Sequence, residues 1–315
     1  MPHISNLEAG LSAAASIRCV LILALVLGAA LLLTTAPASA QTPTPTPTAM
    51  PTATPIPAQL TRDQQACVNE MNKNGEKVNR TQLKENEWCL NRFQRENLDQ
   101  PTFDACTTDD FRDRVTRAEE RTVTREIRKC DPLVVPPPYA YTDAATVNAA
   151  GVNHALWLLY QIFGGPPVDD ADLFTKATNN DTANCQREML RRANNLENTV
   201  LRAVNRAKRQ ALRDETVDSK AALEDKLRDV LSSNARIKRT EDKLVRRVDR
   251  MCNALLALPD TIFPGVCANP DLSVVEDCVI AAARCEACLK INAFDALDLD
   301  CDQADDQDNT NGSCM

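Results

Sequence analysis

Four cysteines divide residues 67–130 into two arms of nearly equal length. One arm runs from Cys67 to Cys89 and the other from Cys106 to Cys130, and small or apolar residues recur at helical spacing along both, on either side of Pro101. At the rise of an α-helix the arms would be about 33 and 36 Å long. When two such helices lie antiparallel, Cys67 meets Cys130 and Cys89 meets Cys106, and no other pairing joins neighbouring ends. The spacing therefore predicts a helical hairpin with one disulfide at each end.

The expected start of the second arm is marked by Thr107 and Asp110, which form a candidate capping box. This box would place Cys106 just ahead of the first helical turn. The apolar stripe expected on that helix begins at Phe111 and includes Ile127.

The same plan returns in the second half of the chain. The stretch C-V-N-E-M at 67–71 is echoed by C-Q-R-E-M at 185–189, and residues 117–133 match residues 239–255 at seven of seventeen positions. These matches predict a second hairpin built like the first.

The second hairpin lacks an inner pair of cysteines. Its outer cysteines, Cys185 and Cys252, are 67 residues apart, against 63 for Cys67 and Cys130. We expect one disulfide, Cys185–Cys252, with helix packing in place of the inner bridge.

The first 40 residues have the pattern of an export signal. Arg18 precedes an apolar run at residues 19–33, and A-S-A at 38–40 has the small-x-small spacing that signal peptidases cut, so we expect the mature chain to begin at Gln41. An uncleaved membrane anchor is the alternative, although the strongly apolar part is short for a span. Residues 41–58 carry six prolines and no charge, which is typical of an extended spacer.

If the chain is exported, its remaining cysteines are expected to form disulfides. Thirteen cysteines, less Cys19 in the signal, leave twelve, an even number that an oxidising compartment would pair. Near the C-terminus, three cysteines share one face of an expected helix and three lie outside it. The simplest of fifteen pairings joins Cys267 to Cys278, Cys288 to Cys301 and Cys285 to Cys314. A zinc site or a redox pair at Cys285 and Cys288 is the alternative, but redox pairs usually open a helix after a strand.

The chain closes with an aspartate-rich stretch: Asp295, Asp298, Asp300, Asp302, Asp305, Asp306 and Asp308. Asp298, Asp300 and Asp302 resemble the start of a calcium loop, yet Gln303 stands where such a loop needs glycine and Asn309 where it needs glutamate. We expect a solvated acidic tail without a bound metal. Calcium binding at these three aspartates, and folding of the tail against the basic second hairpin, are the alternatives.

Charge and composition narrow the chemistry. Residues 185–252 carry 18 Lys and Arg against 11 Asp and Glu, but no aromatic residue, so we interpret this stretch as a solvated helix face rather than a nucleic-acid site. No glycine-rich phosphate loop is present, and we expect no cofactor. His154 is the only histidine after residue 40; it lies in an apolar stretch without a nearby serine, and we expect no catalytic role for it.

The segment between the hairpins combines a proline-rich turn with the most apolar helix expected after residue 40. The turn is PPPYAY at 136–141, and the helix spans residues 142–163 and stops at Gly164. We expect this helix to be buried and to tie the hairpins together, or else to present a docking face where part of it is exposed.

These motifs together resemble a group of uncharacterised secreted bacterial proteins. The resemblance rests on C-x3-M before a long charged helix, a returning helix that ends in Cys, F-P-G-V-C at 263–267 and the cysteine- and aspartate-rich end, and it covers roughly residues 61–315. It implies disulfide-linked helical hairpins and no particular activity. The missing inner cysteines depart from the fuller pattern, with Ala207 near where one would fall.

We therefore expect an all-α protein of two long antiparallel helical hairpins stapled by disulfides, a buried linking helix and a disulfide-rich C-terminal helical segment. The expected divisions are a signal peptide (1–40), a Pro/Thr-rich linker (41–60), a first hairpin (61–133), a linker with the apolar helix (134–182), a second hairpin (183–255) and a Cys-rich segment with an acidic tail (256–315).

The expected function is that of a secreted, periplasmic or cell-surface binding or structural module without enzymatic activity. Its partner would be an unknown macromolecule, a protein or a polysaccharide, with no nucleic acid and no membrane span after signal cleavage. The alternative is a hydrolase that acts on an envelope or extracellular polymer through paired carboxylates. A groove between the hairpins would favour binding, whereas a cleft with two carboxyls about 5–10 Å apart and flanking aromatic residues would favour hydrolysis.

Overall fold

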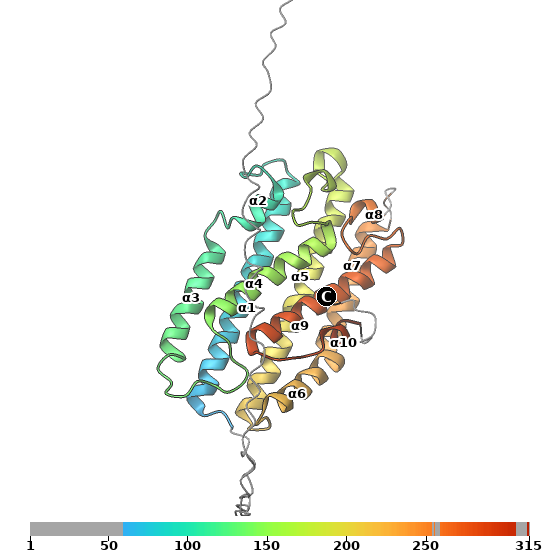
Figure 1. Cartoon of the computed structure of the whole chain (residues 1–315). Coiled ribbons are helices and arrows are strands. Elements are labelled where there is room, and N and C mark those ends of the chain that lie inside the picture. Colours follow the sequence, from blue (N-terminus) through green and yellow to red (C-terminus); the bar gives the residue numbers. More distant parts are fainter. Residues whose placement is uncertain (1–58, 254, 256–258, 307–313, 315) are drawn as a thin grey trace, which may run out of the picture. The chain divides into compact units, whose positions relative to one another are not determined.

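The computed structural model describes residues 59–253, 255, 259–306 and 314, all within one compact unit (Figure 1). The expected signal peptide, most of the Pro/Thr-rich linker and Asp308 lie outside the described residues. In the described part, every regular element is a helix, so the expected all-α class is confirmed.

The first hairpin consists of α1 (Arg62–Phe93), a short α2 (Phe103–Thr108) and α3 (Arg114–Lys129). Thr61 begins α1 with a capping box, in which its hydroxyl accepts from the Gln64 N–H and the Gln64 side chain accepts from the Thr61 N–H. Disulfides Cys67–Cys130 and Cys89–Cys106 close the two ends.

The capping box expected at Thr107 and Asp110 is wrong. Thr107 lies inside α2, where its hydroxyl donates to the Asp104 carbonyl. Cys106 therefore lies within a helix rather than ahead of one. α3 starts later, at Arg114, where the Asp110 carboxylate alone accepts from three successive N–H groups, those of residues 114, 115 and 116. One carboxylate satisfies these helix-end donors without a partner threonine.

The apolar stripe expected on the second arm is also partly wrong. Phe111 precedes the helix and is 54 % exposed, and Ile127 is 57 % exposed. The buried face of α3 consists of Val115, Ala118 and Thr122. Ile127 follows Thr122 by five residues, which turns it about 140° away from that face.

The second hairpin pairs one long helix with a return arm in two pieces. α5 (Lys176–Arg213) runs out, and α6 (Lys220–Ser233) and α7 (Ala235–Cys252) run back. The return arm breaks at Asn234, whose side chain accepts from the N–H groups of Arg236 and Ile237 and so caps α7. A single disulfide, Cys185–Cys252, joins the hairpin where it was expected.

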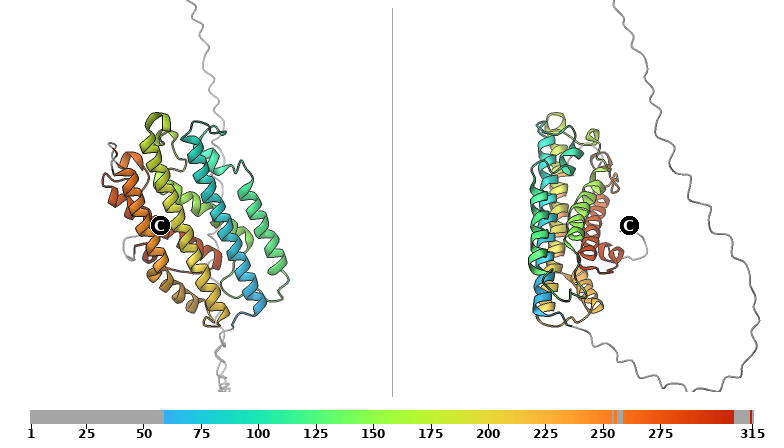
Figure 2. Two further views of the ribbon diagram at one scale, coloured as in Figure 1. Left: turned by 180° about the vertical axis from the view of Figure 1, so that it is seen from behind. Right: turned by 60° about the vertical axis from the view of Figure 1, so that its left-hand side comes forward.

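Two further helices cover one face of the hairpins. α4 (Ala144–Phe163) packs on α1, α9 (Leu272–Asp295) packs on α5, and the two helices also contact each other. Figure 2 shows α1, α3, α5 and α7 as one layer and α4 with α9 as a second. Gly75 allows the close approach of the layers, because a Cβ there would lie 2.6 Å from Val147 and 2.7 Å from Phe294.

α4 is the expected linking helix and is mostly buried, although Trp157 is 46 % exposed. The remaining short elements are η1 (Asp170–Asp172), α8 (Pro259–Ile262) and α10 (Cys301–Asp306). Around α9, the cysteines pair as 267–278, 288–301 and 285–314, which is the scheme expected from their placement.

Two buried lysines link the two layers. Lys208 of α5 binds Asp295 of α9 and Asn72 of α1, and Lys290 of α9 binds Glu197 of α5 and Asn79 of α1. All four charged side chains are at most 1 % exposed. Each lysine therefore joins three helices at once.

Candidate functional site

The aspartates considered for calcium bind three different partners. Asp298 forms an ion pair with Lys220, Asp300 accepts from the Gln303 N–H, and Asp302 accepts from the Cys314 N–H. Among the residues that the structure describes, no three His, Cys, Asp or Glu side chains are grouped to hold a metal ion.

The acidic end of the chain is only partly a solvated tail. Asp295 and Asp305 are buried, whereas Asp298 is exposed and pairs with Lys220 at the start of α6. The described part of this end, residues 295–306, thus folds against the second hairpin, which was the alternative considered from its charge. Burial is possible for Asp295 because Lys208 and Asn72 satisfy its carboxylate.

His154 lies between the two helices of the second layer. Its Nδ1 is 2.7 Å from Oε2 of Glu286, which is buried in α9. Cys285 and Cys288, considered for zinc or redox chemistry, belong to two different disulfides.

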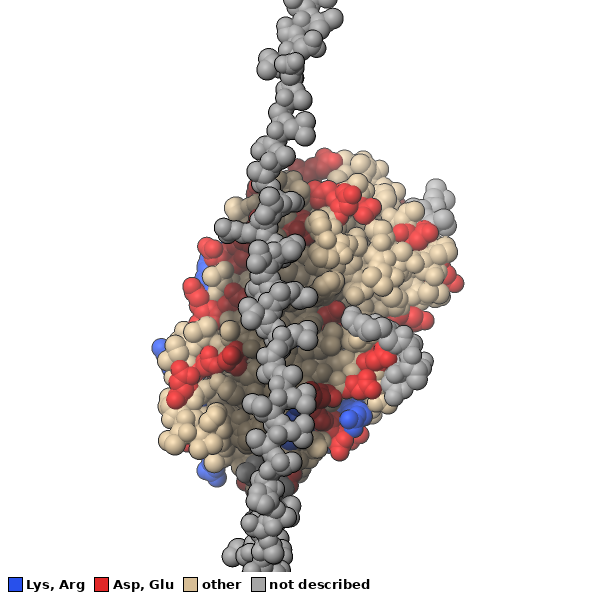
Figure 3. Space-filling view, viewed as in Figure 1, with Lys and Arg blue, Asp and Glu red and all other residues tan. Residues whose placement is uncertain are grey.

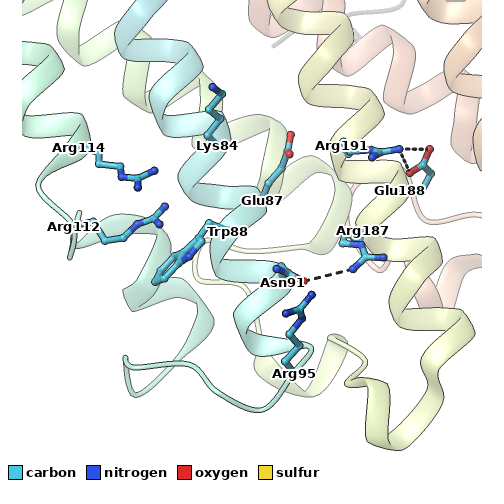
Figure 4. Close-up of a pocket in the computed structure, with 10 residues that line it drawn as sticks. All are labelled: Lys84, Glu87, Trp88, Asn91, Arg95, Arg112, Arg114, Arg187, Glu188 and Arg191. Carbon is cyan, nitrogen blue, oxygen red and sulfur yellow. Dashed lines mark hydrogen bonds and ion pairs between the residues drawn. The ribbon is translucent and has the colours of Figure 1, made fainter.

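A hollow lined mainly by basic side chains lies between α1 and α5, one helix from each hairpin (Figure 4). It has a volume of about 580 Å³ and continues into a second hollow of about 550 Å³, with which it shares Lys84, Glu87 and Arg191. We call the two together the basic groove. Nine of its side chains are cationic: Arg80, Lys84, Arg95, Arg112, Arg114, Arg187, Arg191, Arg192 and Arg202. Only two, Glu87 and Glu188, are acidic.

Helical periodicity places the groove residues that belong to α1 on one stripe of that helix. Residues 80, 84, 87, 88 and 91 recur at intervals of three or four, so they share a face of the helix, and Arg95 follows in the turn after α1. Asn86 points the other way, because its side chain donates to the Ala155 carbonyl of α4. The basic groove therefore opens on the side of the hairpin layer that faces away from α4.

Trp88 and Arg112 form a fixed wall of the basic groove. The Arg112 guanidinium lies 3.8 Å from the centre of the Trp88 ring, a stacking that favours both groups. Arg112 also makes an ion pair of 2.6 Å with Glu85, which is buried. The indole and the guanidinium are thus held in place before any ligand binds.

The two glutamates of the basic groove differ in their environments. Burial raises the pKa of Glu87, and a 3.0 Å hydrogen bond from Asn194 and nearby cationic side chains offset this only in part. Burial also acts on Glu188, but its hydrogen bonds with Arg192 and Arg191 outweigh it and hold its pKa below the usual value. Glu188 is thus a structural counter-ion, with both oxygens in ion pairs.

The face that carries α4, α9 and α10 is predominantly acidic. The chain as a whole has a formal net charge of −8, and Figure 3 shows acidic side chains prevailing over basic ones on the face of α4, α9 and α10. The basic groove therefore concentrates positive charge on an otherwise acidic protein. Such a concave site attracts anions more strongly than scattered surface charges do.

Sequence reasoning missed the basic groove because it treated the second hairpin alone. Residues 185–252 contain no aromatic residue, but the groove takes Trp88 and Lys84 from the first hairpin. The stripe on α1 was a usable signal, since Arg80 and Lys84 are in register with it. What the sequence did not reveal is that α1 and α5 lie side by side.

No protein family, curated protein or solved structure matches this chain.

Proposed function

We propose that this protein is an exported binding module without catalytic activity, and that its basic groove binds an acidic polymer. The observation that carries the proposal is the gathering of nine cationic side chains around two acidic ones in a groove between the hairpins. A groove between hairpins is the feature that favours binding over hydrolysis.

The length and openness of the site suit an extended ligand. From Arg187 to Arg202 the side of the groove formed by α5 rises about 22 Å. Several repeat units of a linear polymer can lie along such a distance, so that successive anionic groups meet successive cations from both helices. Guanidinium groups predominate, and their planar donors match carboxylate and sulfate oxygens two at a time.

A hydrolase is the second candidate, because the basic groove contains two carboxyls and one indole. The opposite pKa shifts of Glu87 and Glu188 are the kind of difference that separates an acid from a base. However, Arg191 and Arg192 occupy both oxygens of Glu188. Glu87 is then the only carboxyl of the groove that could take part in acid–base chemistry, and hydrolysis by paired carboxylates needs two. Binding is therefore the better-supported function.

Export is part of the proposal and rests on the pairing of the cysteines. Six disulfides stabilise the described part of the chain, as is common in oxidising compartments. None of the described helices has the length and apolar character needed to cross a membrane. We propose cleavage before Gln41, a spacer at residues 41–60 and kinship with the secreted bacterial helical-hairpin proteins that the motifs resemble.

Binding of dextran sulfate, with uncharged dextran as the control ligand, tests the proposed function by calorimetry. The chain from residue 41 should bind dextran sulfate with an affinity that falls as salt rises, since exposed charges are screened. The double variant Arg187→Gln/Arg191→Gln should bind about tenfold more weakly, because each exposed charge contact contributes about 0.5–1 kcal/mol.

The matched control is Lys226→Gln/Arg228→Gln on α6. It removes the same two charges from exposed positions outside the basic groove and should leave the affinity within about twofold, since distant exposed charges are screened. Equal losses in the two double variants would show that net charge, rather than the groove, controls binding. No binding of dextran sulfate by the wild-type chain would overturn the proposed function.

A further inference from the structure

We infer that the acidic polymer is a polysaccharide that carries carboxylates, a polyuronate, rather than a polymer of phosphates. This inference rests on the proposed function and names its ligand class. The inference is drawn from the neutral and acidic side chains of the basic groove. Binding of anions by positive charge alone does not explain why these side chains are there.

Four amide side chains line the basic groove. Asn194, Asn195 and Asn198 come from one turn of α5, and Asn91 comes from α1. An amide both donates and accepts, which suits a sugar hydroxyl and offers an anionic oxygen only half of its capacity. A groove built for anions alone would gain more from lysine or arginine at these positions.

In two of these amides the side-chain oxygen accepts no hydrogen bond within the described residues. The Oδ1 atoms of Asn194 and Asn198 are buried and have no hydrogen-bond partner within the described residues. Asn194 is itself only 3 % exposed, and its Nδ2 is already bound to the Leu83 carbonyl and to Glu87. Buried acceptors are usually satisfied, so the groove wall favours a ligand that supplies hydroxyl donors.

Glu87 points to the same chemistry. One of its oxygens accepts from Asn194, and within the described part of the chain no hydrogen bond or ion pair engages the other. A carboxylate that faces a groove repels phosphate and sulfate but accepts hydrogen bonds from hydroxyls. Glu87 therefore selects against a polyanion that has acceptors only.

The cations supply the complementary half of the recognition. Arg95 and Arg187 lie beside Asn91 at one end, and Arg80 and Arg202 lie at the other, with the three asparagines of α5 between them. A polyuronate presents both groups in alternation, carboxylates for guanidinium pairs and ring hydroxyls for amides and Glu87. Inorganic polyphosphate presents charge without hydroxyls along its length.

Calorimetry with three probes at one ionic strength tests the inference on the chain from residue 41. The probes are hexagalacturonate, the same hexamer with its carboxyls reduced to alcohols, and inorganic polyphosphate of equal charge. Hexagalacturonate should bind at least about tenfold tighter than either of the other two, because it alone engages both the guanidiniums and the acceptors.

A variant that lacks two of the amides distinguishes recognition of uronate hydroxyls from attraction by charge alone. Asn195→Ala/Asn198→Ala should weaken hexagalacturonate by about five- to tenfold, because one or two hydrogen bonds to hydroxyls are lost, and should leave polyphosphate unchanged. Thermal unfolding of the variant provides the check that it is folded.

The outcomes distinguish this inference from the proposed function. If polyphosphate binds as tightly as hexagalacturonate, or if the amide variant weakens both ligands equally, the assignment of a polyuronate ligand is wrong. The proposal that the groove binds an acidic polymer would then still stand. Equal binding of the reduced hexamer would overturn the role of the carboxylates. If neither hexagalacturonate nor polyphosphate binds and dextran sulfate fails as well, both conclusions fall.

Discussion

The buried pair Lys290–Glu197 provides the sharpest test of how the two layers are held together. Lys290 lies on α9 and Glu197 on α5, and both side chains are fully buried. The Lys290 Nζ also donates to Asn79 of α1 at 2.5 Å, and the second oxygen of Glu197 has no partner within the described residues. Burial holds the pKa of Lys290 well below its usual value. The pair is thus desolvated, and neither charge has another counter-ion.

Lys290→Met should therefore strand the Glu197 carboxyl in the core. Removing one partner of a buried pair lowers the free energy of unfolding by about 3–5 kcal/mol. For a domain of this size each kcal/mol shifts the melting temperature by about 2–4 °C, so a fall of about 6–20 °C is expected. Replacing both partners, in Lys290→Met/Glu197→Leu, should recover most of the loss, because apolar groups of similar size need no counter-charge.

Urea unfolding of the wild type, the two single variants and the double variant measures this cycle. Lys238→Met is the matched control, because the Lys238 side chain is 73 % exposed and its ion pairs contribute at most about 1 kcal/mol. A loss below about 1 kcal/mol for Lys290→Met, or a double variant no more stable than the singles, would refute the assignment of this pair as a buried contact that stabilises the joining of the layers.

Three further perturbations follow from single contacts. Burial and then the charges of neighbouring aspartates raise the pKa of Glu276 from 4.5 to about 8, so the folded state loses stability as pH rises between these values. In scanning calorimetry Glu276→Gln should match the wild type near pH 4 and exceed it by up to about 5 kcal/mol at pH 8.5. Replacing Cys185 and Cys252 by alanine should lower the free energy of unfolding by about 4 kcal/mol through the 67-residue loop, and a loss below about 1 kcal/mol would contradict this. Asp110→Ala should cost about 1–2 kcal/mol, because three N–H groups at the start of α3 lose their acceptor, whereas Asp110→Asn should retain part of it.

Much of the architecture could be predicted because the constraints are carried by the spacing of cysteines along helices. Cys67 and Cys130 must meet if two arms of equal length fold back, and the structure joins them with a Cα separation of 5.0 Å. The same reasoning covers Cys185 and Cys252. Covalent geometry and helical rise are local rules, so they can be applied without knowing how the rest of the chain packs.

The capping of α3 and the burial of lysines could not be predicted in the same way. Asp110 caps a helix that begins at Arg114, six residues later than the Thr107 pattern indicates, because its carboxylate accepts from three N–H groups at that helix end. Lys208 and Lys290 look like solvated charges in the sequence. Their burial depends on Asp295 and Glu197, which are brought to them from distant segments.

The candidate site was missed for a related reason. Its cations come from both hairpins, and each hairpin alone resembles a solvated face with mixed charge. Only the side-by-side placement of α1 and α5 turns two stripes into one groove. Segments that are about 100 residues apart contribute Lys84 and Arg191, and helical periodicity does not report on which helices are neighbours.

The central claim, that an acidic polymer binds in the basic groove, can be measured with the two tryptophans of the chain. Trp88 lies in the groove, and Trp157 lies on α4, in the opposite layer. The variant Trp157→Phe keeps only the groove fluorophore, and Trp88→Phe keeps only the other. Dextran sulfate should cause a saturable change in fluorescence in Trp157→Phe, with the affinity found by calorimetry, and no change in Trp88→Phe. Binding by calorimetry without a response from Trp88, or with a response from Trp157 alone, would place the ligand elsewhere and contradict the account.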